Sequence, residues 1–276
     1  MNILVPTDFS DCANNAFHVA CDLALPKKAT LHLFHAADLP SDWNSLESEE
    51  KANDARHKYI AIESRTRLKA LQEEAHTMGI QCRVHYSGGN FIDKIPEYLN
   101  QEKIDLIVMG SHGVSGKEEW FIGSNTQKAV RKIHLDTLVV KNEVENFSPE
   151  KVCFVSNLNK EDNIAFHNFL HFIKDYSPSE VHILTIDTSS WFSQPPIVVL
   201  DVLKDYEKLA LEYGCQTHFY KDYSVQSGIR HFVAQHHIDL IGISYKTRNP
   251  IKRIFLGSNV EMLINHSEIP VYCVNK

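Results

Sequence analysis

Three glycines in the first half of the sequence have a spacing that could form a phosphate-binding loop. Two residues separate Gly110 from Gly113, and nine residues separate Gly113 from Gly123. Glycine lets the backbone turn sharply and approach a ligand closely, because it has no Cβ. Ser124 follows at the expected start of a helix, where free N–H groups and the helix dipole favour a phosphate. This spacing therefore predicts that the segment binds the phosphates of a nucleotide.

A second set of polar residues follows the first apolar run of the chain. Residues 2–6 are typical of a short strand, and Thr7 and Asp8 come directly after it. Ligands of open parallel sheets bind beyond the carboxyl ends of the strands, so Thr7 and Asp8 are candidates for contact with a ligand. A structural interpretation stays open, in which the glycines only shape turns and Asp8 only caps a helix.

The elements that would position these residues alternate between strand and helix. Such alternation is typical of an α/β fold, with a five-stranded parallel sheet that has helices on both faces. Residues 104–109 are apolar throughout, as expected of a strand buried on both faces. We expect strands at residues 2–6, 29–36, 81–86, 104–109 and 137–141, and helices at 11–25, 48–78, 90–101 and 124–133.

The chain contains two copies of this pattern. Residues 104–109 (IDLIVM) reappear as 238–243 (IDLIGI), and residues 121–125 (FIGSN) reappear as 255–259 (FLGSN), both at an offset of 134. We therefore predict two tandem Rossmann-like domains, residues 1–143 and 150–276, related by a pseudo-twofold axis. The second copy should have strands at 151–156, 180–187, 215–220, 239–244 and 270–274, and helices at 161–175, 198–213, 224–236 and 258–265.

The second copy has lost two of the three glycines. At the same offset, Ser244 stands for Gly110 and Thr247 for Gly113, whereas Gly257 is kept. When residues 5–9 are matched to residues 155–159, the carboxylate of the first loop is missing as well. The basic residues at 246, 248, 252 and 253 allow two interpretations, a solvated surface or an altered pocket for another anion.

The glycine spacing resembles the ATP-binding pattern of the universal stress protein family, and residues 6–10 (PTDFS) resemble the first loop of that family. The resemblance extends over both halves and implies a tandem universal stress protein with ATP, with or without magnesium, in the first domain only. Glu118 and Glu119 depart from the pattern, because they place two negative charges beside the expected phosphate path. The resemblance implies the nucleotide-binding residues Pro6, Thr7, Asp8, Ala36, Met109, Gly110, His112, Gly113, Gly123, Ser124, Asn125 and Thr126.

Composition and charge exclude several classes of protein. A net charge of −7 argues against binding to nucleic acid or to an anionic membrane. No apolar run is long enough for a transmembrane helix, and the first residues do not resemble a signal peptide. Six cysteines without a C-x-x-C pair fit a cytoplasmic location. We expect no metal site, because no Cys/His pattern has zinc-ligand spacing.

Three functions remain open from the sequence. The first is a nucleotide-dependent regulatory protein of the stress response that acts on an unidentified protein partner. The second is a nucleotide-free scaffold of the same family that binds proteins or small apolar ligands. The third is an enzyme with at most slow ATP hydrolysis, although no catalytic residues can be assigned. The two copies are expected to form an intramolecular pseudo-dimer through residues 137–141 and 271–274, and further homodimerisation stays open.

Overall fold

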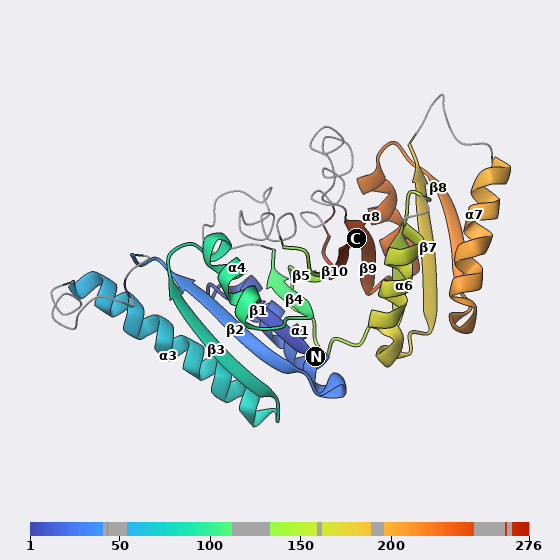
Figure 1. Cartoon of the computed structure of the whole chain (residues 1–276). Helices are drawn as coiled ribbons and strands as arrows, with labels where there is room; N and C mark the ends of the chain where they lie inside the picture. Colours follow the sequence, from blue (N-terminus) through green and yellow to red (C-terminus); the bar gives the residue numbers. More distant parts are fainter. Residues whose placement is uncertain are drawn as a thin grey trace. The chain divides into compact units, whose positions relative to one another are not determined.

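The computed structural model describes residues 1–40, 43, 54–111, 133–158, 162–188, 196–245, 263 and 267–275. The chain divides into two compact units (Figure 1). Unit 1 comprises Met1–Leu135 and Val140–Phe147, and unit 2 comprises Asp136–Val139 and Ser148–Lys276. The helices expected at 124–133 and 258–265 lie outside the described residues, except for Ile133 and Leu263.

The sheet of unit 1 is parallel and places β1 between β2 and β4. The strands are β1 (Asn2–Pro6), β2 (Thr30–Ala37), β3 (Gln81–Gly88) and β4 (Leu106–Gly110). Their order is β3-β2-β1-β4, with Ile3 opposite both Leu31 and Leu106. Parallel pairing brings the carboxyl ends of β1 and β4 together at one edge of the sheet, which is where the sequence places the candidate site.

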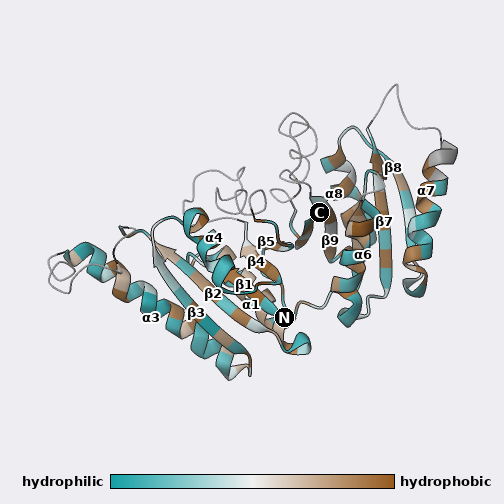
Figure 2. Cartoon of the chain, viewed as in Figure 1, coloured by the Kyte–Doolittle hydropathy of each residue, from teal (hydrophilic) through white to brown (hydrophobic). Residues whose placement is uncertain are grey.

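The helices of unit 1 begin at residues that cap their first turns. These helices are α1 (Asp11–Lys27), α3 (Ala55–Thr77) and α4 (Phe91–Gln101). The Ser10 side chain accepts from the backbone of Ala13, which caps α1 at the end of the first loop. Helix α3 packs on β2 and β3 but is largely hydrophilic (Figure 2). Tyr59 and Ile62 of α3 are exposed, whereas Leu68 is buried.

Unit 2 repeats the parallel arrangement. Its parallel strands have the order β8-β7-β6-β9-β10. They are β6 (Lys151–Val155), β7 (Glu180–Asp187), β8 (Gln216–Lys221), β9 (Leu240–Tyr245) and β10 (Val271–Asn275). The helices are α6 (Asp162–Ile173), α7 (Pro196–Leu209) and α8 (Val225–His236), and two 3₁₀ turns, η2 (Lys174–Tyr176) and η3 (Leu211–Tyr213), extend α6 and α7. The α/β class with a mostly parallel sheet is therefore confirmed in both copies.

The last strand of the first copy, β5 (Thr137–Val140), pairs with the last strand of the second copy, as the sequence predicts. The pairing is antiparallel, with Leu138 opposite Tyr272. Just before β5, the Asp136 carboxylate accepts from the Tyr272 hydroxyl at 2.7 Å and from the Asn275 amide at 2.8 Å. Burial raises the pKa of Asp136, because desolvation disfavours its charged form. These bonds attach residues 136–139 to unit 2.

A group of histidines lies near the amino end of the unit 2 sheet, with His182 buried and His218 and His236 half-buried. His182 Nδ1 lies 3.0 Å from His218 Nε2, and His182 Nε2 lies 3.2 Å from a Glu180 oxygen. Lys151 pairs with the other Glu180 oxygen at 2.6 Å, and the His236 ring lies 5.3 Å from His182 and 5.2 Å from His218. Glu180 can only accept, so His182 donates to it through Nε2. Burial lowers the pKa of both His182 and His218. With neutral rings, His182 Nδ1 accepts from His218 Nε2.

We expect the free energy of unfolding of unit 2 to fall as the pH is lowered through the histidine range. Burial, with the neighbouring His182 and His236, lowers the pKa of His218 from 6.5 to about 4. Burial also lowers the pKa of His182. Between pH 6.5 and about pH 4, the unfolded chain binds more protons at His218 than the folded chain does. Protonation in this range therefore favours unfolding. Above pH 6.5 the effect should be absent.

Hydrogen exchange of unit 2 peptides at several pH values measures this dependence. His218→Gln should flatten the profile between pH 4 and 6.5, because the depressed group is gone. The matched control is His231→Gln, which removes a half-exposed histidine paired with Asp222 and should leave the slope in place. An unchanged slope in His218→Gln would contradict the assignment.

Candidate functional site

The first loop (residues 6–10) forms a tight turn directly after β1. The Thr7 amide donates to the Phe34 carbonyl of β2 at 2.9 Å, and the Phe9 amide donates to Thr7 Oγ1 at 3.0 Å. Phe9 has a φ of 62°, which is uncommon for a residue with a side chain. The Asp8 carboxylate accepts from the Ser10 amide at 3.0 Å. Asp8 therefore stabilises the turn, and its side chain stays exposed. The residue that caps α1 is Ser10, which corrects the structural interpretation in which Asp8 caps a helix.

The end of β4 lies against the start of α1. A Cβ added to Gly110 would lie 2.7 Å from the backbone C and O atoms of Cys12 and 2.9 Å from the Ala13 nitrogen. Glycine at position 110 is thus required by the close approach of α1. The packing of α1 therefore explains this glycine without a ligand, and the role of Gly110 in nucleotide binding stays a prediction.

The other described residues of the predicted site have different surroundings. Pro6 ends β1, and Thr7 is buried with 6% exposure. Ala36 lies near the end of β2, and Met109, a residue of β4, is buried in the hydrophobic core. The parallel register brings the first loop and the β4 end to one edge of the sheet. Six predicted residues lie outside the described part of the chain: His112, Gly113, Gly123, Ser124, Asn125 and Thr126.

A cluster of rings and guanidinium groups borders the first loop. The Phe9 ring lies 4.5 Å from the His35 ring, and the Arg67 guanidinium carbon lies 4.8 Å from the Phe9 centroid. Further out, the Tyr86 ring lies 6.2 Å from His35, and Arg65 lies over Tyr86 at 5.1 Å. No sequence pattern predicted that Arg65 or Arg67 would lie near the site, because both belong to a helix with many charged residues.

His35 fixes the backbone of the first loop. Its Nδ1 atom lies 2.8 Å from the Thr7 carbonyl oxygen, which can only accept, so Nδ1 carries the proton. Burial lowers the pKa of His35, and Arg67 lowers it further, whereas the Thr7 carbonyl and Asp8 raise it. A neutral His35 therefore holds the turn at neutral pH.

The corresponding loop of unit 2 shows that the sequence alignment was shifted by one residue. The Ser156 amide donates to the Leu184 carbonyl at 3.0 Å, and the Leu158 amide donates to Ser156 Oγ at 2.9 Å. Leu158 has a φ of 61°, so it corresponds to Phe9, and Ser156 corresponds to Thr7. The residue in the Asp8 position is Asn157, not Leu158. The offset is 149 here (Ile3 to Val152) and 134 at β9 (Leu106 to Leu240), because the intervening segment is shorter in unit 2, where α7 has 14 residues and α3 has 23.

Unit 2 closes the carboxyl ends of β6 and β9 with a buried carboxylate. Asp162, which is 1% exposed, accepts from Ser156 Oγ at 3.0 Å and from Ser244 Oγ at 2.6 Å. The Asn157 amide adds a contact to Asp162 at 3.3 Å, and the Tyr206 hydroxyl lies 3.0 Å from Ser156 Oγ. Burial raises the pKa of Tyr206 to about 12. We call these five residues the Asp162 network.

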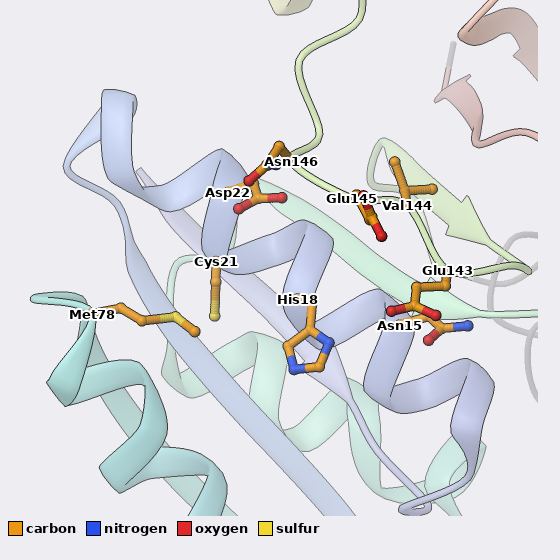
Figure 3. Close-up of a pocket in the computed structure, with 9 residues that line it drawn as sticks. All are labelled: Asn15, His18, Cys21, Asp22, Met78, Glu143, Val144, Glu145 and Asn146. Carbon is orange, nitrogen blue, oxygen red and sulfur yellow. The ribbon is translucent and has the colours of Figure 1, made fainter.

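A separate cavity of about 260 Å³ lies in unit 1 beside α1 (Figure 3). Its lining includes the carboxylates of Asp22, Glu143 and Glu145 together with His18, and Asp22 accepts from the Phe147 amide at 2.7 Å. Such a lining repels phosphate, and it contains none of the predicted nucleotide residues. Within the described ranges, no group of three or more His, Cys, Asp or Glu side chains has the geometry to hold a metal ion.

Comparisons with known proteins identify the family. A family model described as the universal stress protein family matches residues 1–141 and 157–275. A universal stress protein of Methanocaldococcus jannaschii is 28% identical over 139 residues, covering 50% of this chain and 81% of that protein. A relative from Staphylococcus haemolyticus is 31% identical over 155 residues, covering 54% and 90%. The crystal structure of a universal stress protein from Archaeoglobus fulgidus matches the fold with a TM-score of 0.77 at 18% identity, covering 99% of this chain and 98% of that one. None of the helices in the described segments is long and apolar enough to span a membrane.

Proposed function

Because the chain belongs to the universal stress protein family, we propose that unit 1 binds ATP and that its occupancy regulates a protein partner. The first loop and the β4 end lie at the carboxyl edge of a parallel sheet, where open α/β sheets bind ligands. The sequence continues from this edge into the glycine pattern of Gly113 and Gly123. A universal stress protein has been crystallised in complex with cAMP.

The observation that carries the proposal is the contrast between the two sheet edges. In unit 2, Asp162 places a buried carboxylate between the ends of β6 and β9. The matched residues of unit 1 are Ala13 for Asp162 and Gly110 for Ser244, and neither has a charged side chain. A carboxylate in this position repels a phosphate and fills space with its own hydrogen-bonding partners. Unit 1 is therefore the better anion site, and we propose that it alone holds ATP.

The residues of unit 1 suit ATP, and each part of the ligand can be assigned a role. Asp8 would accept from a ribose hydroxyl, because its side chain is exposed at the edge of the sheet. Magnesium would accompany the triphosphate as an oxygen-seeking cation. We propose retention of ATP rather than fast turnover, since the sequence offers no evident base to activate water.

One observation favours a second function. Gly110 is fully explained by the packing of α1, so one of the three glycines does not depend on a ligand. This is what a nucleotide-free scaffold of the family would also show. A direct binding experiment distinguishes the two functions, because only the first requires that the chain bind ATP.

We expect the purified full chain to release adenine nucleotide on denaturation, or to bind ATP in a titration, with one site per chain. Gly113→Val should abolish binding, because a branched side chain blocks the approach of backbone to phosphate. The matched control is Thr247→Val at the corresponding position of the second copy, which should bind like the wild type. Mass spectrometry of the released nucleotide and titration with ATP, ADP, AMP and cAMP make the measurement.

Two results would contradict this assignment. Absence of binding at millimolar ATP would favour the scaffold function. Loss of binding in Thr247→Val but not in Gly113→Val would move the site to the second copy. Release of phosphate above background in the presence of magnesium would instead favour the slow enzyme.

A further inference from the structure

The first loop of unit 1 has a ring cluster that its counterpart in unit 2 lacks. Both loops adopt the same turn, with φ values of 62° at Phe9 and 61° at Leu158. Both turns are closed by a hydroxyl that accepts from the residue two positions later, from Thr7 in one unit and from Ser156 in the other. The turn itself therefore does not require an aromatic ring. Something else must account for the rings in unit 1.

The side chains around the two turns differ in kind. The amides of Thr7 and Ser156 donate to Phe34 and Leu184, so His35 of unit 1 corresponds to Thr185 of unit 2. Unit 2 thus has leucine in place of Phe9 and threonine in place of His35. The hydroxyl of Thr185 is buried and has no hydrogen-bond partner among the residues that the structure describes, whereas His35 donates to the Thr7 carbonyl at 2.8 Å.

In unit 1 the cluster connects α3 to both sides of Asp8. The Arg67 guanidinium of α3 lies 4.8 Å from the Phe9 ring, and that ring lies 4.5 Å from His35. His35 in turn bonds the carbonyl of Thr7. Because Thr7 and Phe9 are the neighbours of Asp8 in the chain, restraining both limits the directions that the Asp8 side chain can take.

We propose that Arg67 is a positioning residue of the nucleotide site: by contact with Phe9 it holds the first loop so that the Asp8 carboxylate is oriented toward the ribose before the ligand arrives. This inference rests on the proposed function. A planar guanidinium over an aromatic face supplies a directional attraction, and orientation before binding removes an ordering cost from the binding step. The same contact explains why phenylalanine, rather than the leucine of unit 2, occupies position 9.

Two single variants and their combination test the contact. Phe9→Leu introduces the residue that unit 2 has in the same turn, so the fold of the loop is retained. Arg67→Gln removes the guanidinium. Each should weaken ATP binding about twofold to fivefold. The double variant should be no weaker than either single variant, because both remove the same contact. The matched control is Arg65→Gln, whose guanidinium lies over Tyr86 and not over Phe9, and which should bind ATP like the wild type.

A second measurement needs no ligand. In the ligand-free chain, Arg67→Gln should speed hydrogen exchange of the Phe9 and Ser10 amides, which donate to Thr7 Oγ1 and Asp8 Oδ1. The pKa of His35, followed by its imidazole NMR signals, should rise, because Arg67 lowers it. A residue that acted only on the bound phosphates would leave amide exchange in the free protein unchanged.

The outcomes distinguish the positioning role of Arg67 from the proposed binding of ATP by unit 1. Unchanged amide exchange in Arg67→Gln overturns the positioning role, and so do additive effects of the two substitutions on ATP affinity. Faster exchange in a protein that binds no nucleotide overturns the proposed function but leaves the restraint of the loop by Arg67 established. Equal loss of affinity in Arg65→Gln would show that positive charge, and not the contact with Phe9, is what the site needs.

Discussion

Gly110→Ser should lower the free energy of unfolding of unit 1 by about 2–3 kcal/mol, the range of an overpacked buried site. The new Cβ would lie 2.7 Å from two backbone atoms of Cys12, and backbone cannot rotate away as a side chain can. Either α1 moves away from β4 or the end of β4 shifts. Both changes would disturb the first loop, so ATP binding should weaken together with stability.

Hydrogen exchange followed by mass spectrometry measures this effect in each unit separately, which matters because two units need not unfold together. Gly110→Ala is the matched comparison. Since the clash comes from the Cβ itself, alanine should destabilise unit 1 nearly as much as serine. Peptides of unit 2 serve as the internal control and should exchange as in the wild type. An alanine variant as stable as the wild type would show that α1 does not approach β4 this closely.

At position 110 the structure adds a cause for glycine, the packing of α1 against β4, that the sequence did not show. The strand before it was predicted from its apolar run, and the loss of glycine in the second copy was also visible. The sequence could not show which way a Cβ would point. In the structure it points at Cys12 and Ala13, which are nearly a hundred positions away in the chain. Contacts of this range depend on how a helix sits on its sheet, and no local pattern encodes that.

The elements themselves were well predicted because their signals are local. The strand at residues 2–6 and the strand at residues 180–187 have the predicted bounds, and the helix expected at 90–101 begins one residue later at Phe91. Asn90 accepts from the Ile92 amide, which explains why this helix starts where it does. Alternating or continuous apolar runs and capping residues lie within a few positions of the elements they determine.

The loop of the second copy was misaligned for a different reason. An offset of 134 fits the end of each copy, and no sequence motif marks where insertions change it. The turn geometry at Leu158 and the hydrogen bonds of Ser156 fix the register instead. Neither the Asp162 network nor the contact of Arg67 with Phe9 could be predicted from the sequence, and the reason is the same for both. The members of the network come from two strand ends and two helices that the sequence does not relate to one another.

Asp162→Ala should lower the free energy of unfolding of unit 2 by about 3 kcal/mol, which is typical when one partner of a buried charged network is removed. The Ser156 and Ser244 hydroxyls and the Asn157 amide would lose the oxygen that accepts from them. Asp201→Ala should cost less than about 0.5 kcal/mol, because Asp201 is exposed and its ion pair with Lys204 lies in solvent.

Removing the donors together with the acceptor should restore part of the lost stability. In Asp162→Ala with Ser156→Ala and Ser244→Gly, two stranded hydroxyls are gone, and replacing both sides of a buried hydrogen bond costs far less than replacing one. The triple variant should therefore have a higher free energy of unfolding of unit 2 than Asp162→Ala. Urea unfolding, followed by hydrogen exchange of unit 2 peptides, measures this difference. A triple variant less stable than the single one would mean that the serines stabilise unit 2 independently of the carboxylate. Recovery would instead show that the cost of Asp162→Ala comes mainly from the buried hydroxyls that lose their acceptor.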